Sequence, residues 1–228
     1  MIIIKFIAVI LIGYLLGSIP FGMLVIRRGA GVDVRKYGSG KTGATNVLRI
    51  AGKKMAALTA GLDIAKGLLA VSFAGLIMGN STASAGSITF GADTAKGLAA
   101  LAAIAGHIWP VFLKFRGGRG VAVFYGNLLA LSPFVALSGG ASLLLIAGLT
   151  RYVSLGSIIG SVVTYALFSF LAITGGSPVE YLTYSLIGTL TIIVMHRDNI
   201  ERLLAGKERK LGEKADRRDF SPPANRTG

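Results

Sequence analysis

Cysteine is absent from the 228 residues, histidine occurs only as His107 and His196, and acidic residues number just ten. The lack of cysteine excludes a disulfide framework and a thiolate zinc site, and two histidines are too few for a histidine-rich metal centre. Charged residues make up 15% of the chain, whereas soluble domains carry about 25%. A charge-poor chain in which 53% of the residues are hydrophobic is typical of a membrane protein.

The charge that is present has one dominant sign. Twenty-four Lys and Arg residues give a formal net charge of +14. A basic excess can indicate nucleic-acid binding, but Phe220 is the only aromatic residue in the sequence after His196, too few for a platform on which successive bases would stack. We therefore expect no nucleic-acid partner, and we interpret the excess as the Lys and Arg of cytoplasmic loops.

Apolar segments predict an all-α integral membrane protein with about seven transmembrane helices, each spanning helix needing roughly 20 apolar residues. The first segment lacks a clean signal-peptidase site, so we interpret it as a retained helix. The apolar region between 120 and 150 is broken at Ser132 and Pro133, and we divide it into two short helices. The expected helices are Ile3–Val25, Met55–Met78, Ala95–Leu113, Val121–Leu131, Phe134–Thr150, Ser154–Ile173 and Tyr181–Met195.

Basic residues alternate from loop to loop. The loop at 27–54 holds eight Lys and Arg, the loop at 79–92 holds none, and nine follow His196. The positive-inside rule then places the N-terminus outside and the C-terminus in the cytoplasm, which requires an odd number of spans. We expect one transmembrane domain over 1–208, followed by a basic, flexible cytoplasmic tail over 209–228.

The frame G-x-D-x-A-K-G-L-x-A occurs at 61–70 and again at 91–100. The two copies would run in opposite directions and the similarity ends after ten residues, so we interpret the echo as coincidence and not as a repeat. Asp63 and Lys66 of the first copy lie inside an expected span. Their i, i+3 spacing lets them pair on one helix face, which lowers the cost of both charges and predicts a structural role.

The segment GSGKTGATNVLR at 38–49 predicts an anion site. Its glycines permit a sharp turn that presents backbone N–H groups, and its arginine offers a planar guanidinium suited to phosphate. The GSGKT core is similar to a Walker loop, but Arg35 stands where the first glycine should be and no buried strand precedes it, which argues against an ATPase. The candidate residues are Gly38, Ser39, Gly40, Thr45, Asn46 and Arg49, with Lys41 as a further candidate.

The segment KFRGGRGVA at 114–122 predicts a second anion site. Bare glycine backbone between two guanidinium groups can wrap closely around an anion. The alternative is a tight basic turn that only satisfies the topology rule. The candidate residues are Arg116, Gly117, Gly118, Arg119 and Gly120.

The third polar segment, MHRDNIERLLAGKE, follows the last expected span. His196 stands at the inner mouth of that span, and Asn199 lies one turn later on the same helix face. An interfacial hydrogen-bonding role is the alternative for His196. We interpret His107 as a packed helix histidine, and we take Ser154 and Ser157 as further candidates because they share one side of a helix near the cytoplasm.

Together these segments resemble the bacterial acyl-phosphate:glycerol-3-phosphate acyltransferase family. The resemblance includes GSIPFG, GSGKTGATNVLR, GHIWPVFLKFRGGRGVA and HRDNIERLLAGKE in that order, and it covers most of the chain. It implies a seven-helix membrane fold. Together with the loop charges, we expect a multi-pass protein of the bacterial cytoplasmic (inner) membrane with its active site on the cytoplasmic side, and we expect a monomer. The resemblance also implies transfer of a fatty acyl group from acyl phosphate to glycerol 3-phosphate, giving lysophosphatidic acid and phosphate without acyl-CoA, cofactor or metal.

By the same resemblance, residues of the three motifs take roles in the reaction. The implied catalytic residues are His196, Asn199, Ser39 and Arg49, the implied phosphate-binding loop includes Gly117, Gly118 and Gly120, and Glu208 is implied to be structural. The sequence departs from the family pattern at Lys41, where asparagine is usual, and at Arg116 and Arg119, where lysine is usual. Met195 stands where the family usually has arginine. These departures keep positive charge at 116 and 119 but change its geometry.

Three alternatives remain open at this point. Either His196 or the donor's own phosphate removes the hydroxyl proton, and the absence of a motif carboxylate to orient His196 favours the phosphate. Ser39 as an acyl-bearing nucleophile is less favoured because no base is adjacent to it in the sequence. The other class of function is a membrane transporter of organic phosphates, although its polar sites should lie at the midplane and not at one face.

Overall fold

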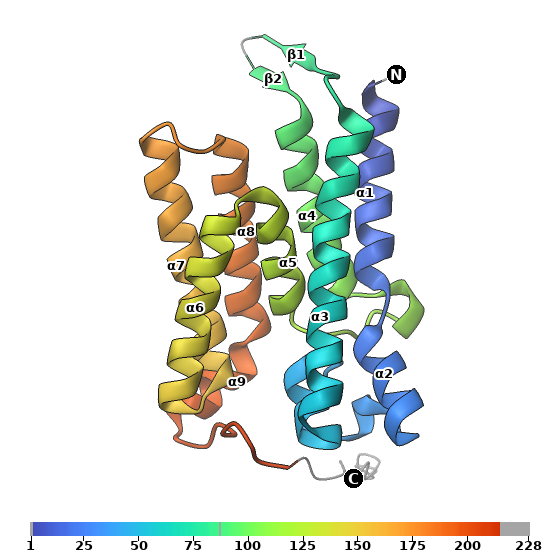
Figure 1. The fold of residues 1–228 in the computed structure, drawn as a ribbon, viewed down its shortest axis with the longest axis vertical. Coiled ribbons are helices and arrows are strands. Elements are labelled where there is room, and N and C mark those ends of the chain that lie inside the picture. The colour runs from blue at the N-terminus through green and yellow to red at the C-terminus, as the bar shows by residue number, and fades with distance from the viewer. Residues whose placement is uncertain (1, 87, 215–228) are drawn as a thin grey trace, which may run out of the picture.

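The computed structural model describes residues 2–86 and 88–214 as a bundle of α-helices running lengthwise (Figure 1). The beginning of α1 and the helix α9 lie at opposite ends of the bundle. The helices are α1 Ile2–Ser18, α2 Phe21–Ala30, α3 Ala44–Met78, α4 Ala92–Ile108, α5 Val121–Leu131, α6 Pro133–Thr150, α7 Val153–Ile173, α8 Val179–Met195 and α9 Arg197–Leu204. The 3₁₀ turns η1 Val34–Lys36 and η2 Val111–Leu113 and the hairpin strands β1 Ala83–Ala85 and β2 Ile88–Phe90 complete the described elements.

The described helices include five that are long and apolar enough to cross a membrane, or six if the bent pair α8 and α9 forms one span. The sequence boundaries of α5 and α6 agree with the expected pair of short helices. However, α5 has only 11 residues, so it is about 16 Å long, roughly half the hydrocarbon thickness of a bilayer. The helical membrane class is confirmed, and the count of seven spans stays a prediction.

Two expected boundaries shift for identifiable reasons. The first expected span is two helices, because Pro20 lacks an N–H group and the chain turns between Ser18 and Phe21. The expected loop at 27–54 is helical from Ala44 onward. The helix has a kink at Gly52, whose φ of 79° is a conformation that glycine adopts without steric cost. Of the expected flexible tail, residues 209–214 are described and 215–228 lie outside the described residues.

Small residues bring the helices close together. Gly13 and Gly17 of α1 face the backbone of Ala99 and Ala103 in α4, so closely that a methyl group at either glycine would overlap the α4 carbonyls. Small residues four positions apart are common where membrane helices pack on each other. In lipid no hydrophobic effect drives helices together, so close van der Waals packing of their backbones contributes instead. The same spacing recurs at 156 and 160 of α7, against α6.

The bundle has two groups of helices joined by the short helix α5. Figure 1 shows α1, α3 and α4 packed together on one side and α6, α7 and α8 on the other, with α5 between them. The core contains Phe124 of α5 and Tyr184 of α8, whose rings stack with centroids 5.7 Å apart. Asn127 donates to Tyr184 Oη and to the carbonyl of Ala100, so α5 is also hydrogen-bonded to both groups.

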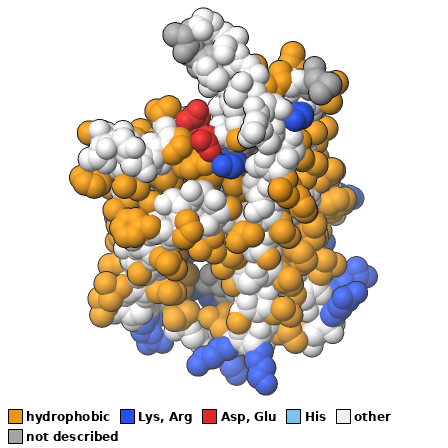
Figure 2. Space-filling model, turned by 45° about the horizontal axis from the view of Figure 1, so that its top comes forward, with side chains coloured by type: hydrophobic (Ala, Val, Ile, Leu, Met, Phe, Trp, Pro, Cys, Tyr) orange, Lys and Arg blue, Asp and Glu red, His pale blue; other side chains and the backbone are white. Residues whose placement is uncertain are grey.

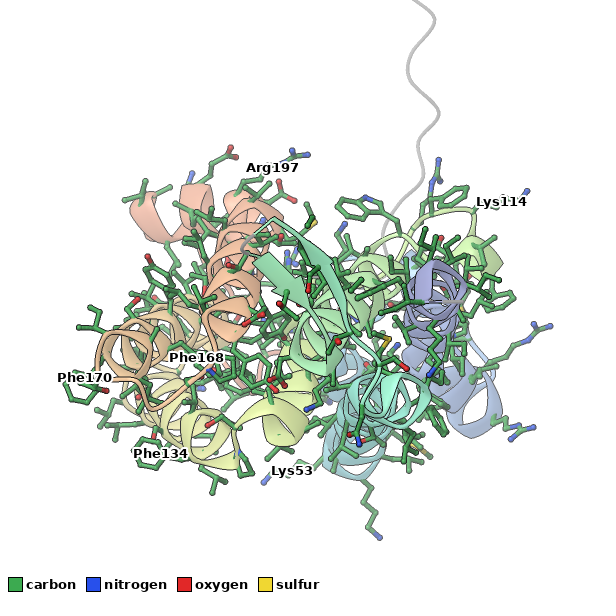
Figure 3. The ribbon with its side chains drawn as sticks, turned by 90° about the horizontal axis from the view of Figure 1, so that it is seen from above. Lys53, Lys114, Phe134, Phe168, Phe170 and Arg197 are labelled. Atoms are coloured by element: carbon green, nitrogen blue, oxygen red, sulfur yellow. The ribbon has the colours of Figure 1, made fainter. Side chains whose placement is uncertain are left out.

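The outer surface is apolar along its sides and basic at one end (Figure 2). In Figure 3, Phe134 of α6 and Phe170 of α7 point away from the bundle while Phe168 points into it. Their exposed fractions agree, at 63%, 62% and 0% respectively. An apolar belt of this kind is suited to lipid, and the basic end is the one that carries α2, α9 and the first turns of α3.

Cysteine labelling should place the two ends of the bundle on opposite sides of the membrane. Ser84 in β1 and Lys53 near the beginning of α3 are both exposed, at opposite ends, and the chain has no other cysteine to react. We expect an impermeant thiol reagent added outside intact cells to label Ser84→Cys at once and Lys53→Cys only after permeabilisation. Labelling of both from the same side would contradict this orientation.

Candidate functional site

One cavity of about 590 Å³ lies in the half of the bundle nearer the basic end. Its walls come from α3, α5, α6, the beginning of α7 and the junction of α8 with α9. Of the residues expected to form the site, the cavity is lined by Ser39, Lys41, Thr45, Asn46, Arg49, Asp63, Arg119, Gly120, Ser154, Ser157, His196, Asn199 and Glu208. Segments more than 150 residues apart in the sequence therefore meet around one space, as the three motifs predict.

Four helix N-termini border this cavity. The first residues of α3, α5 and α7 line it, as does His196, the residue preceding α9. Within 2–86 and 88–214, the residue that precedes each of the four helices makes no side-chain hydrogen bond that caps the N-terminus. The free N–H groups and the positive ends of the helix dipoles therefore face the same space, and this arrangement favours anions.

Asn46 holds the first loop in shape. Its side-chain amide donates to the carbonyls of Val34, Tyr37 and Lys41, and its Oδ1 accepts the backbone N–H of Ser39 at 3.1 Å. Gly38 and Gly40 have φ of 53° and 70°, the left-handed conformation that glycine adopts without strain. These two glycines shape the turn without lining the cavity.

Arg49, near the beginning of α3, and Arg119, in the loop before α5, both line the cavity and bring positive charge to it. Arg119 Nε donates to the carbonyl of Met195 at 3.1 Å, which fixes the guanidinium beside His196. Burial, and secondly the charge of Arg202, lower the pKa of Arg119 to about 10, so it stays protonated at pH 7. Arg49 donates to the carbonyl of Arg209 at 3.4 Å, leaving most of its guanidinium donors for a ligand.

The second loop divides into two parts. The N–H groups of Gly117 and Gly118 already donate to the carbonyls of Ile108 and His107, each at 3.1 Å, and neither glycine lines the cavity. Arg116 is exposed and does not line it either. Arg119 and Gly120 are therefore the residues of this loop that meet the cavity, at the beginning of α5.

His196 is buried at the end of α8 and has a defined tautomer. Its Nδ1 lies 2.8 Å from the carbonyl oxygen of Ile192. Since a carbonyl can only accept, Nδ1 carries the hydrogen and Nε2 is left as an acceptor. Burial, and next the nearby charge of Arg119, lower the pKa of His196 to about 4, so the ring is neutral at physiological pH.

Glu208 lines the cavity and joins α7 to α9. Its Oε1 accepts hydrogen bonds from Ser154 Oγ at 3.0 Å and Asn199 Nδ2 at 2.6 Å, and its Oε2 accepts one from Arg202 Nε at 2.7 Å. A carboxylate only accepts, so the Asn199 amide must donate to it and its Oδ1 must point elsewhere. That oxygen is buried with no hydrogen-bond partner among the described residues.

Comparison with known proteins decides the family. A model for glycerol-3-phosphate acyltransferase matches residues 7–206. A protein of Dehalococcoides mccartyi named glycerol-3-phosphate acyltransferase 3 is 56% identical over 215 residues, which cover 94% of this chain and all of the relative. The chain belongs to the glycerol-3-phosphate acyltransferase family.

More distant relatives support the same assignment. A glycerol-3-phosphate acyltransferase of Nostoc sp. is 40% identical over 91% of this chain and 92% of its own. The crystal structure of PlsY, an integral membrane glycerol 3-phosphate acyltransferase in its glycerol 3-phosphate form, matches with a TM-score of 0.78 and 39% identity, covering 91% of this chain and 96% of PlsY. Its lysophosphatidic acid form matches with a TM-score of 0.77. This acyltransferase is therefore a multi-pass helical membrane protein.

The motifs of the acyltransferase sequence did not indicate its apolar wall. This wall lies between α3, α5 and α6, and two of its residues, Leu137 and Leu144, are 67% and 71% exposed on the lipid-facing surface. Apolar residues in a membrane protein carry no motif, so only their position in the fold identifies them. The wall consists of Ala60, Ile64, Val121, Ala122, Tyr125, Leu129, Ala136, Leu137, Gly140, Ala141, Leu143 and Leu144.

The fold places the remaining expected residues around this site. Ser157 Oγ donates to the carbonyl of Val153, its own helix, while Ser154 is held by Glu208. Ser39 Oγ accepts the N–H of Lys41 at 3.4 Å, and no imidazole or carboxylate is hydrogen-bonded to it among the described residues. Lys66 lies behind the cavity wall, paired with Asp63.

Removing the Glu208 carboxylate should destabilise the acyltransferase. Glu208→Ala removes the ion pair to the partly exposed Arg202 and leaves the buried Asn199 amide without its acceptor, and an unsatisfied buried donor costs about 1–3 kcal/mol. We expect a lower midpoint of thermal unfolding in detergent and loss of activity. The control is Glu201→Gln, an exposed carboxylate on α9. Equal unfolding midpoints for Glu208→Ala and the control would contradict the joining role of Glu208.

Proposed function

We propose that the protein transfers a fatty acyl group from acyl phosphate to glycerol 3-phosphate, giving lysophosphatidic acid and inorganic phosphate. One observation carries this proposal: a single cavity combines an anion-favouring end with an apolar wall that reaches the lipid-facing surface. Two phosphate-bearing substrates require the first part. A long acyl chain is stabilised in the second by about 0.8 kcal/mol per buried CH₂.

The positive end of the cavity suits a reaction between two anions. Arg49, Arg119 and the four helix N-termini offset the repulsion between two phosphate groups held close together. The departure from lysine to arginine at 119 adds a planar donor that also binds the Met195 carbonyl. Acyl phosphate is a mixed anhydride and already activated, so the proposed reaction uses no acyl-CoA, ATP or cofactor.

In the proposed reaction the glycerol hydroxyl oxygen attacks the acyl carbonyl carbon. The bond from that carbon to the phosphate oxygen breaks, and the hydroxyl proton ends on the released phosphate. We assign the orientation of glycerol 3-phosphate to His196 Nε2 and Asn199 Oδ1, two acceptor atoms left open by their other hydrogen bonds. They can accept the hydrogen of the hydroxyl that does not react, so the attacking hydroxyl keeps its proton for the phosphate. Burial and the charge of Arg119 lower the pKa of His196, which makes its ring a weak base and favours the donor phosphate as the proton acceptor.

We also propose the setting of the reaction. The polar end of the cavity belongs to the end of the bundle rich in Lys and Arg, which supports an active site on the cytoplasmic side of a bacterial inner membrane. We propose a monomer as the active unit. The two matching crystal structures of PlsY are its glycerol 3-phosphate form and its lysophosphatidic acid form.

Reconstituted vesicles test this function against the transport alternative. With acyl phosphate present, labelled glycerol 3-phosphate should become lipid-soluble lysophosphatidic acid, and acyl-CoA should not replace acyl phosphate. Accumulation of unchanged glycerol 3-phosphate inside the vesicles would contradict the proposal and indicate a transporter. Equal rates with acyl-CoA would contradict the assigned donor.

The pH profile should separate the two routes for the proton. With phosphate as the acceptor, the acid limb of kcat/KM near pH 6 belongs to the substrates and should survive in His196→Gln, whose amide oxygen replaces the Nε2 acceptor. We expect this variant to exceed His196→Ala by about tenfold, the worth of one hydrogen bond of about 1.4 kcal/mol. If His196→Gln is as inactive as alanine while folded and able to bind glycerol 3-phosphate, His196 is the base.

A further inference from the structure

Lys66, Asp63 and His107 form a buried ionic cluster to which the proposed reaction assigns no role. Lys66 Nζ lies 2.8 Å from Asp63 Oδ1, and His107 Nδ1 lies 3.6 Å from the same oxygen. All three side chains are buried, and the Asp63 oxygens have ionic contacts without a hydrogen bond of good geometry among the described residues. A buried ion pair adds little net stability, and ionisable groups inside a span usually have a functional role.

The ring of His107 leaves no space for a side chain at residue 118. The backbone of Gly118 is not in the left-handed region, so its conformation alone would accept an alanine. A methyl group there would instead overlap Nε2 of the His107 ring. The His107 carbonyl also accepts the N–H of Gly118, and a methyl group at Gly117 would overlap that carbonyl oxygen. Gly117 and Gly118 thus pack directly on His107, and Arg119 is the next residue in the chain.

Lys66 contacts the chain segment that supports the loop containing Thr42. Its Nζ donates to the carbonyl of Ile19 at 2.8 Å, in the break between α1 and α2, and lies 5.7 Å from the centre of the Phe21 ring. One residue further on, Gly22 packs so closely on the carbonyl of Thr42 that a side chain there would overlap it. The position of α2 therefore fixes the position of the first loop.

Residues from both loop supports border the same small gap beside the cluster. Thr42 of the first loop and Pro110, which precedes the second loop, line it together with Asp63, Lys66 and His107. Asp63 and His107 also line the large cavity. The cluster is thus the place where the two loops are connected through side chains instead of through the chain itself.

We propose that the Lys66–Asp63–His107 cluster is a positioning element that sets the spacing between the loop at 38–46 and the loop at 117–120. Through these loops it sets Arg49 against Arg119, the two guanidinium groups that receive phosphate. This inference rests on the proposed function and adds to it three residues that position other groups and take no chemical part in the reaction. A misplacement of about 1 Å at such a site can lower a rate about hundredfold.

A double-mutant cycle tests the contact between His107 and residue 118. Gly118→Ala should lower kcat/KM about tenfold or more, mainly through a higher KM for glycerol 3-phosphate, because the methyl group displaces the loop from the ring. His107→Ala removes the ring, so adding Gly118→Ala to it should cause no further loss. If the two losses multiply instead, the ring does not position this loop. His107→Asn replaces His107→Ala in the cycle if the alanine variant does not fold.

The second copy of the sequence frame supplies a matched control for the charges. Asp93 and Lys96 form the same i, i+3 pair, 3.0 Å apart, in the first turns of α4 beside the hairpin end of the bundle. We expect Asp63→Asn to raise the KM for glycerol 3-phosphate about tenfold or more and Asp93→Asn to leave it unchanged. If Asp63→Asn does not fold, Asp63→Asn with Lys66→Met removes both charges and restores the unfolding midpoint but not the KM.

The outcomes separate this inference from the proposed function. If the unmutated protein forms no lysophosphatidic acid from acyl phosphate, the proposed function fails. If it does, and the Asp63 variants keep the KM of the control, or recover it together with their stability, the cluster is only structural. A raised KM in a variant with a normal unfolding midpoint supports positioning.

Discussion

The constraint on which this structure depends is the repulsion between two phosphate groups that must meet at the edge of an apolar medium. Backbone N–H groups and arginine side chains both offset this repulsion. Among the described residues, four helices begin at one cavity without side-chain caps, and Arg49 of α3 and Arg119 of the loop before α5 line it as well. Helix N-termini are fixed dipoles that need no reorganisation when charge arrives, so they suit a site that holds anions during a reaction. The half-length helix α5 follows from this requirement, since its N-terminus must lie at cavity depth.

Two buried polar clusters hold these termini in place from opposite sides. Glu208 connects α7 and α9 at the mouth of the cavity through three accepted hydrogen bonds. On the far side, Asp63 connects the supports of the two loops. Beyond the mouth, the N–H of Leu211 and the carbonyl of Arg151 are hydrogen-bonded at 2.7 Å, so residues at the beginning of the expected tail pack on the helix connection. In both clusters, a buried polar group that lost its partner would cost free energy. This favours the one arrangement of the site in which the partners are kept.

Much of the site could be predicted from the sequence, because glycines, arginines and a histidine at particular spacings have few other uses at one membrane face. The convergence of Ser39, Arg49, Arg119, His196 and Asn199 on one cavity follows those motifs. The hydrogen bonds of Gly117 and Gly118 could not be predicted, since a glycine pair gives no sign of whether its N–H groups meet an anion or a helix end. The carbonyl of Ile192 that orients His196 is likewise invisible in a sequence, because every residue has a carbonyl. The apolar wall has the composition of any membrane helix, and only the fold distinguishes it.

The proposed reaction requires one cavity to hold two phosphate groups at the same time. Inhibition by inorganic phosphate tests it most directly in the purified protein. Phosphate is the product that leaves the donor position, so it should compete with acyl phosphate while glycerol 3-phosphate, at saturation, leaves the inhibition in place. Inhibition by phosphate that saturating glycerol 3-phosphate abolishes would show one shared anion position and would contradict the account.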